Sequence, residues 1–110
     1  MTDERTTVAD LRELVRAFVA ERSWQVFHTP KNLAMSLAIE AAELMEHFQW
    51  LTVEEAMAVR DQPEKRGEVA DELADVLCYA LAMANALDLD VATSVREKMQ
   101  KNIVKYPPPK

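Results

Sequence analysis

Residues 30–49 of this 110-residue chain, PKNLAMSLAIEAAELMEHFQ, decide the fold class. Wound as a helix at about 100° per residue, the stretch has apolar side chains over most of its circumference and polar ones in the remaining arc. A helix of this kind is buried on most sides. Thr29 followed by Pro30 is a strong start signal, because a hydroxyl cap precedes proline in the first turn. The stretch therefore predicts a central, largely buried helix.

Four more helices are expected around it. The chain has one glycine and five prolines, and it shows no strand-type alternation. The five expected helices cover about residues 7–23, 30–49, 52–60, 64–87 and 90–104. The proline-rich tail, about residues 106–110, is expected to be extended. We therefore predict an all-α fold, a single domain over residues 1–110, in which the second and fourth helices are antiparallel neighbours.

The composition excludes several classes of function. The net charge of −6 disfavours binding to a nucleic acid polymer, which needs a basic patch. One glycine excludes phosphate-binding loops and dinucleotide fingerprints, and one cysteine excludes an intramolecular disulfide. The sequence has neither a run of about 18 apolar residues nor the layout of a signal peptide. We expect a cytoplasmic protein without a membrane partner.

Carboxylates gather on two of the expected helices without basic partners among them. On the second helix, Glu40 and Glu43 lie in the polar arc, and Glu40 sits at its apolar edge, where an uncompensated carboxylate is costly. On the fourth helix, acidic residues share about 100° of arc, and like charges four residues apart repel one another: Glu64, Glu68, Asp71, Glu72 and Asp75. A solvated face usually mixes both signs of charge, so these two faces indicate a bound cation.

The ligand type indicates which cation this is. Carboxylate oxygens favour hard cations such as Mg²⁺ or Mn²⁺. A ferritin-like di-iron site is the weaker alternative, because it needs a Glu-x-x-His pair on each of two helices. The pairs here are Glu40-x-x-Glu43 and Glu72-x-x-Asp75, with no histidine at that offset.

These pairs and their surroundings resemble the MazG-like superfamily of all-α nucleoside triphosphate pyrophosphohydrolases, in its dCTP pyrophosphatase-like branch. The resemblance covers about residues 8–107 and rests on four stretches: ERSWQVFHTPKN at 21–32, EAAELMEHFQW at 40–50, DELADVLCY at 71–79 and KMQKNIVKYP at 98–107. It implies a house-cleaning hydrolase that uses Mg²⁺ to cleave a nucleoside triphosphate, dCTP or a modified relative, to the monophosphate and pyrophosphate. It also implies a homotetramer built from dimers, or a homodimer.

The resemblance carries over residue roles at the matching positions. The metal ligands would be Glu40, Glu43, Glu72 and Asp75. On chemical grounds, a carboxylate that is not fully used as a ligand, Glu43 or Glu46, would orient the attacking water as a base. The base pocket would be framed by Trp24, Trp50 and Tyr79. Contacts to the nucleotide and its phosphates, some from across a subunit boundary, would come from Asn32, Lys98, Asn102 and Lys105.

Two alternative functions stay open. A broader nucleoside triphosphate pyrophosphatase is one, because Val15 stands where mammalian-type members of the branch carry a histidine, which predicts looser selection of cytosine. A non-catalytic helical interaction module is the other, although such a scaffold has no use for uncompensated carboxylates. The tryptophans have a plainer reading as covers of a core edge, and His28 as a loop residue.

Overall fold

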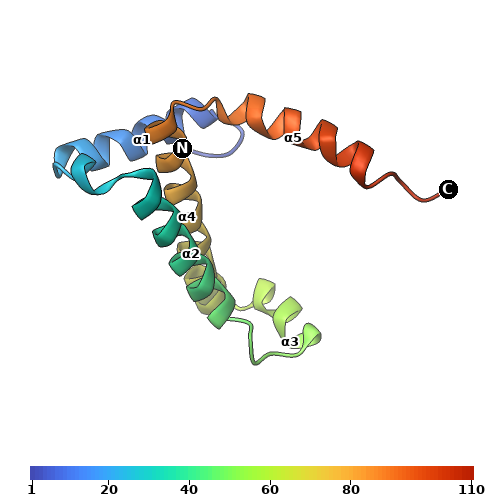
Figure 1. The fold of residues 1–110 in the computed structure, drawn as a ribbon. Helices are drawn as coiled ribbons and strands as arrows, with labels where there is room; N and C mark the ends of the chain where they lie inside the picture. Colours follow the sequence, from blue (N-terminus) through green and yellow to red (C-terminus); the bar gives the residue numbers. More distant parts are fainter.

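The computed structural model describes the whole chain, Met1 to Lys110, and it is helical without strands (Figure 1). Its α-helices are α1 (Val8–Glu21), α2 (Pro30–Glu46), α3 (Val53–Ala58), α4 (Pro63–Leu87) and α5 (Val91–Lys105). Two short 3-10 helices, η1 (Gln25–Phe27) and η2 (Val59–Asp61), follow α1 and α3. The predicted all-α class and each of the five expected helices are confirmed.

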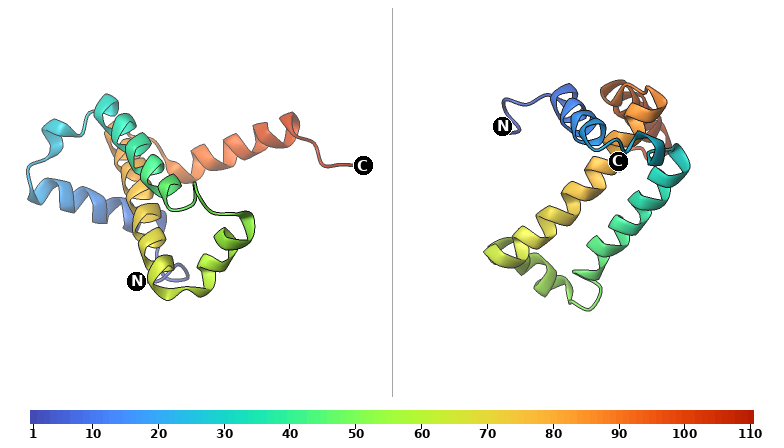
Figure 2. Two further views of the ribbon diagram at one scale, coloured as in Figure 1. Left: turned by 90° about the horizontal axis from the view of Figure 1, so that it is seen from below. Right: turned by 90° about the vertical axis from the view of Figure 1, so that its left-hand side faces the viewer.

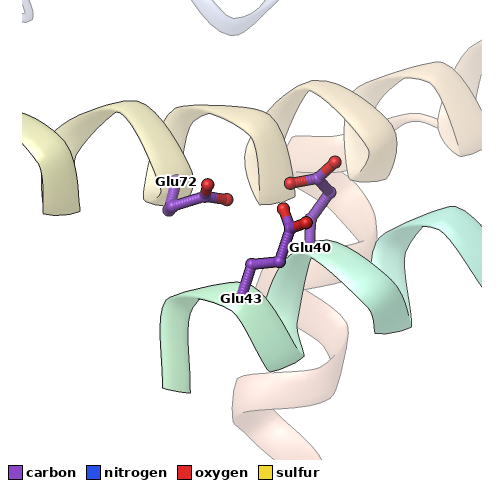
Figure 3. A group of neighbouring side chains, drawn as sticks. All are labelled: Glu40, Glu43 and Glu72. Carbon is purple, nitrogen blue, oxygen red and sulfur yellow. The ribbon is translucent and has the colours of Figure 1, made fainter. Parts of the chain in front are cut away.

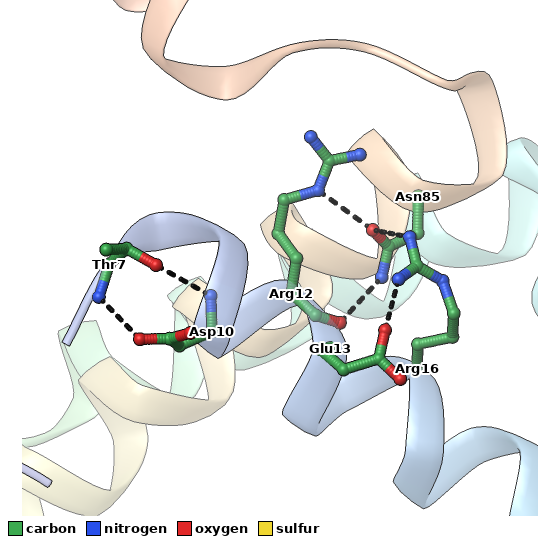
Figure 4. Close-up of polar contacts among 6 residues, drawn as sticks. All are labelled: Thr7, Asp10, Arg12, Glu13, Arg16 and Asn85. Atoms are coloured by element: carbon green, nitrogen blue, oxygen red, sulfur yellow. Dashed lines mark hydrogen bonds and ion pairs between the residues drawn. The ribbon is translucent and has the colours of Figure 1, made fainter.

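Side-chain caps set the helix starts. Thr29 caps α2 by accepting a hydrogen bond at 3.2 Å from a backbone N–H in the first turn. Before α3, Thr52 and Glu55 form the predicted capping box, with bonds of 2.9 and 3.2 Å. Thr7 and Asp10 form the same arrangement before α1, with two bonds of 3.0 Å (Figure 4). Each cap satisfies amides that the first turn leaves free.

The helix ends set the directions of the connecting segments. α2 stops at Glu46, short of the end expected near residue 49, because Phe48 donates its backbone N–H to the Met45 carbonyl at 3.0 Å and tightens the turn. α4 ends at Leu87, and the next residue, Asp88, has a left-handed backbone (φ 52°). After that residue the chain changes direction, and α5 makes an angle of 103° with α4.

The predicted antiparallel pairing of α2 and α4 is confirmed (Figures 1 and 2). α1 packs against the carboxyl-terminal part of α4 and is tied to it by side chains (Figure 4). The Nε of Arg12 donates to Oδ1 of Asn85 at 2.9 Å, and Nδ2 of Asn85 donates to the Arg12 carbonyl at 3.2 Å. Arg12 also donates to the Leu89 carbonyl at 2.6 Å.

α5 extends away from the α2–α4 pair (Figure 1). Its apolar side chains are exposed along the helix: Val95, Met99, Ile103 and Val104. No single helix of the chain is long and apolar enough to cross a membrane, although α4 and α5 pass that length and composition test as a bent pair.

The buried core of the single chain is very small. Only five residues are buried: Val19, Leu33, Val59, Ala82 and Ala84. The accessible surface is 8970 Å², whereas a compact monomer of 12.5 kDa exposes about 6,200 Å². The radius of gyration, 16.6 Å, likewise exceeds the value of about 13 Å typical of a compact domain of this length. The single chain therefore exposes much more surface than a compact domain of its length.

Candidate functional site

The contact between α2 and α4 brings three carboxylates together (Figure 3). Glu40 and Glu43 stand one turn apart on α2, and Glu72 faces them from α4. One oxygen of each residue lies within 4.8 Å of an oxygen of the others. The structure thus gathers three of the four metal ligands that the resemblance implies.

The buried oxygens of this cluster lack partners. Oε2 of Glu40 and Oε2 of Glu72 are both buried, and neither has a hydrogen-bond partner. The adjacent Glu43 carboxyl raises the pKa of Glu40 to about 7, and burial, Glu72 and Asp75 act in the same direction. A buried carboxylate is costly without a donor or a cation.

The cluster fits a hard divalent cation. None of its carboxylates takes part in the ion pairs of the chain, which lie elsewhere on α1 and α4. The donors are all carboxylate oxygens, the type that Mg²⁺ and Mn²⁺ prefer. Of the two histidines, His47 directs Nδ1 toward Lys65, at 2.8 Å, and not toward the cluster.

Asp75 and Glu46 lie outside the group of three. Asp75 follows Glu72 on α4, and it is near enough for its charge to contribute to the raised pKa of Glu40. It lines the cavity next to the cluster. Glu46, the last residue of α2, is exposed. Their assignments as metal ligand and water-activating base stay predictions.

An apolar cavity of about 480 Å³ is lined by residues of α1 and α4 and extends to Asp75, one turn from Glu72. Trp24 and Tyr79, two of the residues expected to frame a base, both line it, and so does Asp75. The Trp24 ring lies edge-on to the Phe18 ring, 5.6 Å between centroids. A cavity walled by aromatic and aliphatic side chains suits a planar ring.

Asn32 has a contact within the chain. Its Nδ2 donates to the Phe27 carbonyl at 3.1 Å, which anchors the segment after α1 to the first turn of α2. That segment carries Trp24, so Asn32 helps to position the wall of the cavity.

The other predicted nucleotide contacts do not reach the cluster within one chain. Trp50 is 86% exposed in the turn after α2. Three lie on α5, which leads away from the cluster: Lys98, Asn102 and Lys105. A single chain therefore contains the carboxylate cluster and the cavity lined by Trp24 and Tyr79, while the predicted basic contacts, Lys98 and Lys105, lie elsewhere.

Among the residues of this cavity that sequence reasoning did not assign to the site, one has a ring that can both donate and accept hydrogen bonds. His28 follows η1 and lines the same wall as Trp24. Its position between Phe27 and the Thr29–Pro30 helix start suggested only a loop, and nothing in its spacing pointed to a cavity.

The fold and the site define a class: all-helical proteins in which carboxylates from two antiparallel helices cluster near an apolar cavity. The sequence model of the MazG-like family matches residues 35–110. The chain belongs to the MazG-like family.

Known relatives agree with this family. The dCTP pyrophosphatase 1 proteins of Rattus norvegicus and Homo sapiens are each 41% identical over 101 residues. These matches cover 92% of this chain, which spans about 59% of the length of either relative. The crystal structure of a pyrophosphatase from Archaeoglobus fulgidus superposes with a TM-score of 0.86 at 38% identity, covering 98% of this chain and 99% of that one.

Proposed function

We propose that this protein is a divalent-metal-dependent nucleoside triphosphate pyrophosphohydrolase that yields a monophosphate and pyrophosphate. One observation carries the proposal: three carboxylates lie within 4.8 Å, two of them with buried, unpartnered oxygens, beside a cavity lined by Trp24 and Tyr79. The names of the relatives support the same reaction class and point to dCTP as a substrate.

The metal would be held by Glu40, Glu43, Glu72 and Asp75. Mg²⁺, with Mn²⁺ as a substitute, would supply Lewis-acid stabilisation of the phosphate charge. These carboxylates repel a triphosphate in the absence of a cation, so substrate binding should require the metal. The proton of the attacking water would pass to Glu43, which lies in the cluster, or to Glu46, about one turn further along α2.

The nucleotide would enter the cavity with its base against Trp24 and Tyr79. Stacking on an aromatic ring stabilises any base by about 1–3 kcal/mol with little discrimination. Val15 offers no hydrogen bond to the base, which favours a broader range of nucleoside triphosphates as the second candidate function. dCTP or a modified relative is our first choice of substrate, in a house-cleaning role in the cytoplasm.

A second copy of the chain would complete the site. The phosphates need cations, and Lys98, Asn102 and Lys105 stand on a helix that extends from the body with an exposed apolar face. Packing of that face on a neighbour would bury part of the excess surface and deliver these side chains, with Trp50, to the neighbour's carboxylates. The assembly would be a homodimer or a homotetramer built from dimers.

Release of pyrophosphate tests the proposal. The wild-type chain should be incubated with each common ribo- and deoxynucleoside triphosphate and Mg²⁺, with a parallel series in excess chelator. We expect pyrophosphate and the monophosphate as the first products, with dCTP among the best substrates and no turnover in chelator. Orthophosphate and a diphosphate as first products would place the protein in another reaction class, and no turnover at all would favour a non-catalytic helical module.

A further inference from the structure

His28 lies where two cavities meet. It lines the 480 Å³ cavity beside the carboxylates and also a second one, of about 350 Å³, behind it. The two cavities share only Val15, Val19, His28 and Ala82, so His28 stands at their junction. The residue is half-buried, and its ring makes no hydrogen bond within the chain, whereas the ring of His47 is bonded to Lys65.

The junction of the two cavities lies about as far from Asp75 as the edge of a nucleotide base lies from its 5′-phosphate. Asp75 lines the cavity at the carboxylate end, and Ala82 lines it two turns further along α4, about 10 Å away. This length is comparable to the reach of a nucleotide from its 5′-phosphate to the far edge of its base. A nucleotide with its phosphates at the carboxylates would therefore place the polar edge of the base near His28.

The other residues shared by the two cavities offer no hydrogen bond to that edge. The polar side chains of the second cavity, Arg16, Gln25 and Asn85, lie beyond the junction, and Arg16 and Asn85 are bonded to each other. Val15, Val19 and Ala82 have no hydrogen-bonding side-chain groups, and a polar edge buried without a partner loses free energy. Tyr79 lies one turn nearer to Asp75, toward the sugar and phosphates. The position of His28 is fixed by its own N–H, which donates to the Gln25 carbonyl at 3.1 Å, and by the bond from Asn32 to Phe27.

We propose that the His28 ring forms the hydrogen bond to the edge of the nucleotide base and is the main determinant of which base is accepted. This inference rests on the function proposed above and deepens it. A neutral imidazole presents a donor or an acceptor according to its tautomer. It can accept from the amino group of cytosine or donate to the carbonyl of uracil, so His28 accepts both pyrimidines and prefers one of them only modestly.

A binding experiment on the wild-type protein tests the contact directly. The chain has two histidines, so imidazole ¹⁵N NMR of histidine-labelled protein gives one set of signals for each. The assembled protein should be titrated with dCMP or dUMP in the presence of Mg²⁺; both are monophosphates, so no turnover interferes. We expect the His28 nitrogens to shift with both nucleotides and those of His47 to stay in place. Unshifted His28 signals at saturating dCMP would overturn the proposal.

Two variants and a control give the energetic test. His28→Ala should weaken dCMP binding and raise the KM for dCTP by at least 10-fold, with kcat largely kept. The amide of His28→Gln both donates and accepts, so this variant should restore part of the affinity. It should also change the ratio of kcat/KM for dCTP to kcat/KM for dUTP. Val26→Ala, at a position that is 74% exposed and outside both cavities, should change neither value.

The two proposals fail in different ways. Normal KM and an unchanged dCTP to dUTP ratio in both His28 variants, with an active wild-type enzyme, would overturn the role of His28 alone. If the wild-type protein releases no pyrophosphate from any nucleotide, the proposed function fails and the role of His28 fails with it.

Discussion

Nζ of Lys65, in the first turn of α4, lies 2.8 Å from Nδ1 of His47 at the end of α2. The contact is partly buried and ties the two helices together where the chain passes through α3. An ammonium group only donates, so His47 accepts through Nδ1 and carries its proton on Nε2. Lys65 also lies 3.6 Å from the Glu68 carboxylate in the next turn.

Removal of this donor should loosen the helix pair. Lys65→Met keeps most of the aliphatic stem and deletes the hydrogen bond, so we expect the free energy of unfolding to fall by about 1 kcal/mol. Urea unfolding followed by circular dichroism measures it. Lys31→Met, at an exposed position on α2, is the matched control and should change stability little. An equal fall in the free energy of unfolding in the two variants would show that the Lys65–His47 bond has no specific role.

The raised pKa of Glu40 makes the stability of the metal-free protein depend on pH. Its pKa rises from 4.5 to about 7 on folding, chiefly because of the neighbouring Glu43 carboxyl, so the folded chain retains a proton that the unfolded chain loses. This contribution is fully present below about pH 4.5 and is lost as the pH rises through about 7. In chelator, the melting temperature should therefore fall across this range.

Mg²⁺ should reverse that trend. It binds the ionised carboxylates, so its stabilising effect by mass action should grow as the pH rises. Differential scanning fluorimetry between about pH 5 and about pH 8, with Mg²⁺ and with chelator, gives the two curves. We expect them to diverge with rising pH. Parallel curves would contradict a cation site at Glu40.

Glu40→Gln should separate catalysis from folding. The variant loses a ligand and a buried charge, so we expect turnover to fall by roughly 100-fold or more. Its helical circular dichroism should be unchanged, and at neutral pH the metal-free variant should be at least as stable as the wild type. Asp75→Asn should also lose activity. Glu64→Gln, on the exposed start of α4, is the control for a simple loss of charge. Near-normal turnover of Glu40→Gln at saturating Mg²⁺ would exclude Glu40 as a ligand.

A Trp50 variant tests whether residues of two chains form the nucleotide site together. The side chain is 86% exposed, so Trp50→Ala should change the stability of a single chain little. In the assembled enzyme we expect KM to rise by roughly 10-fold for all accepted nucleotides, equivalent to about 1.4 kcal/mol of stacking, with a smaller change in kcat. Steady-state kinetics and urea unfolding read the two effects. An unchanged KM together with a lower stability would indicate that Trp50 only covers apolar surface and does not contact the nucleotide.

The exposed face of α5 should mediate assembly. Ile103 is 62% exposed there, and Ile103→Asp places a charge where we expect a neighbouring chain. Light scattering after size exclusion should give a dimer or tetramer for the wild type and a lower mass for the variant, together with a loss of activity. Lys101→Ala, also exposed on α5, serves as control for the mass. A single-chain mass for the wild type would contradict the assembly.

The sequence predicted those parts of the fold that depend on neighbours along one helix. Thr29 and Thr52 identify the starts of α2 and α3, because caps are local. Glu40, Glu43 and Glu72 could be selected because the winding of each helix placed them on polar arcs without cations, and the antiparallel pairing then joined the arcs.

What depends on longer-range contacts could not be read from the sequence. The direction of α5 follows from the left-handed turn at Asp88 and from the lack of a partner within the chain for its apolar face. His28 carried no periodic signal, because it belongs to an irregular segment whose placement depends on the bond from Asn32 to Phe27. The meeting of Trp24 with Asp75 and Tyr79 likewise depends on how α1 crosses α4.

The five-residue core has a consequence for how the protein responds to its own abundance. In the proposed assembly, apolar surface that a single chain exposes would leave water only when chains meet, so folding and association would form one equilibrium in which each chain acts as a ligand for another. The melting temperature should then rise with protein concentration, and dilution alone should increase the unfolded fraction. At low expression, a larger fraction of the chains would be unfolded and accessible to proteases than at high expression. The expression level would therefore affect the rate of degradation without any regulator.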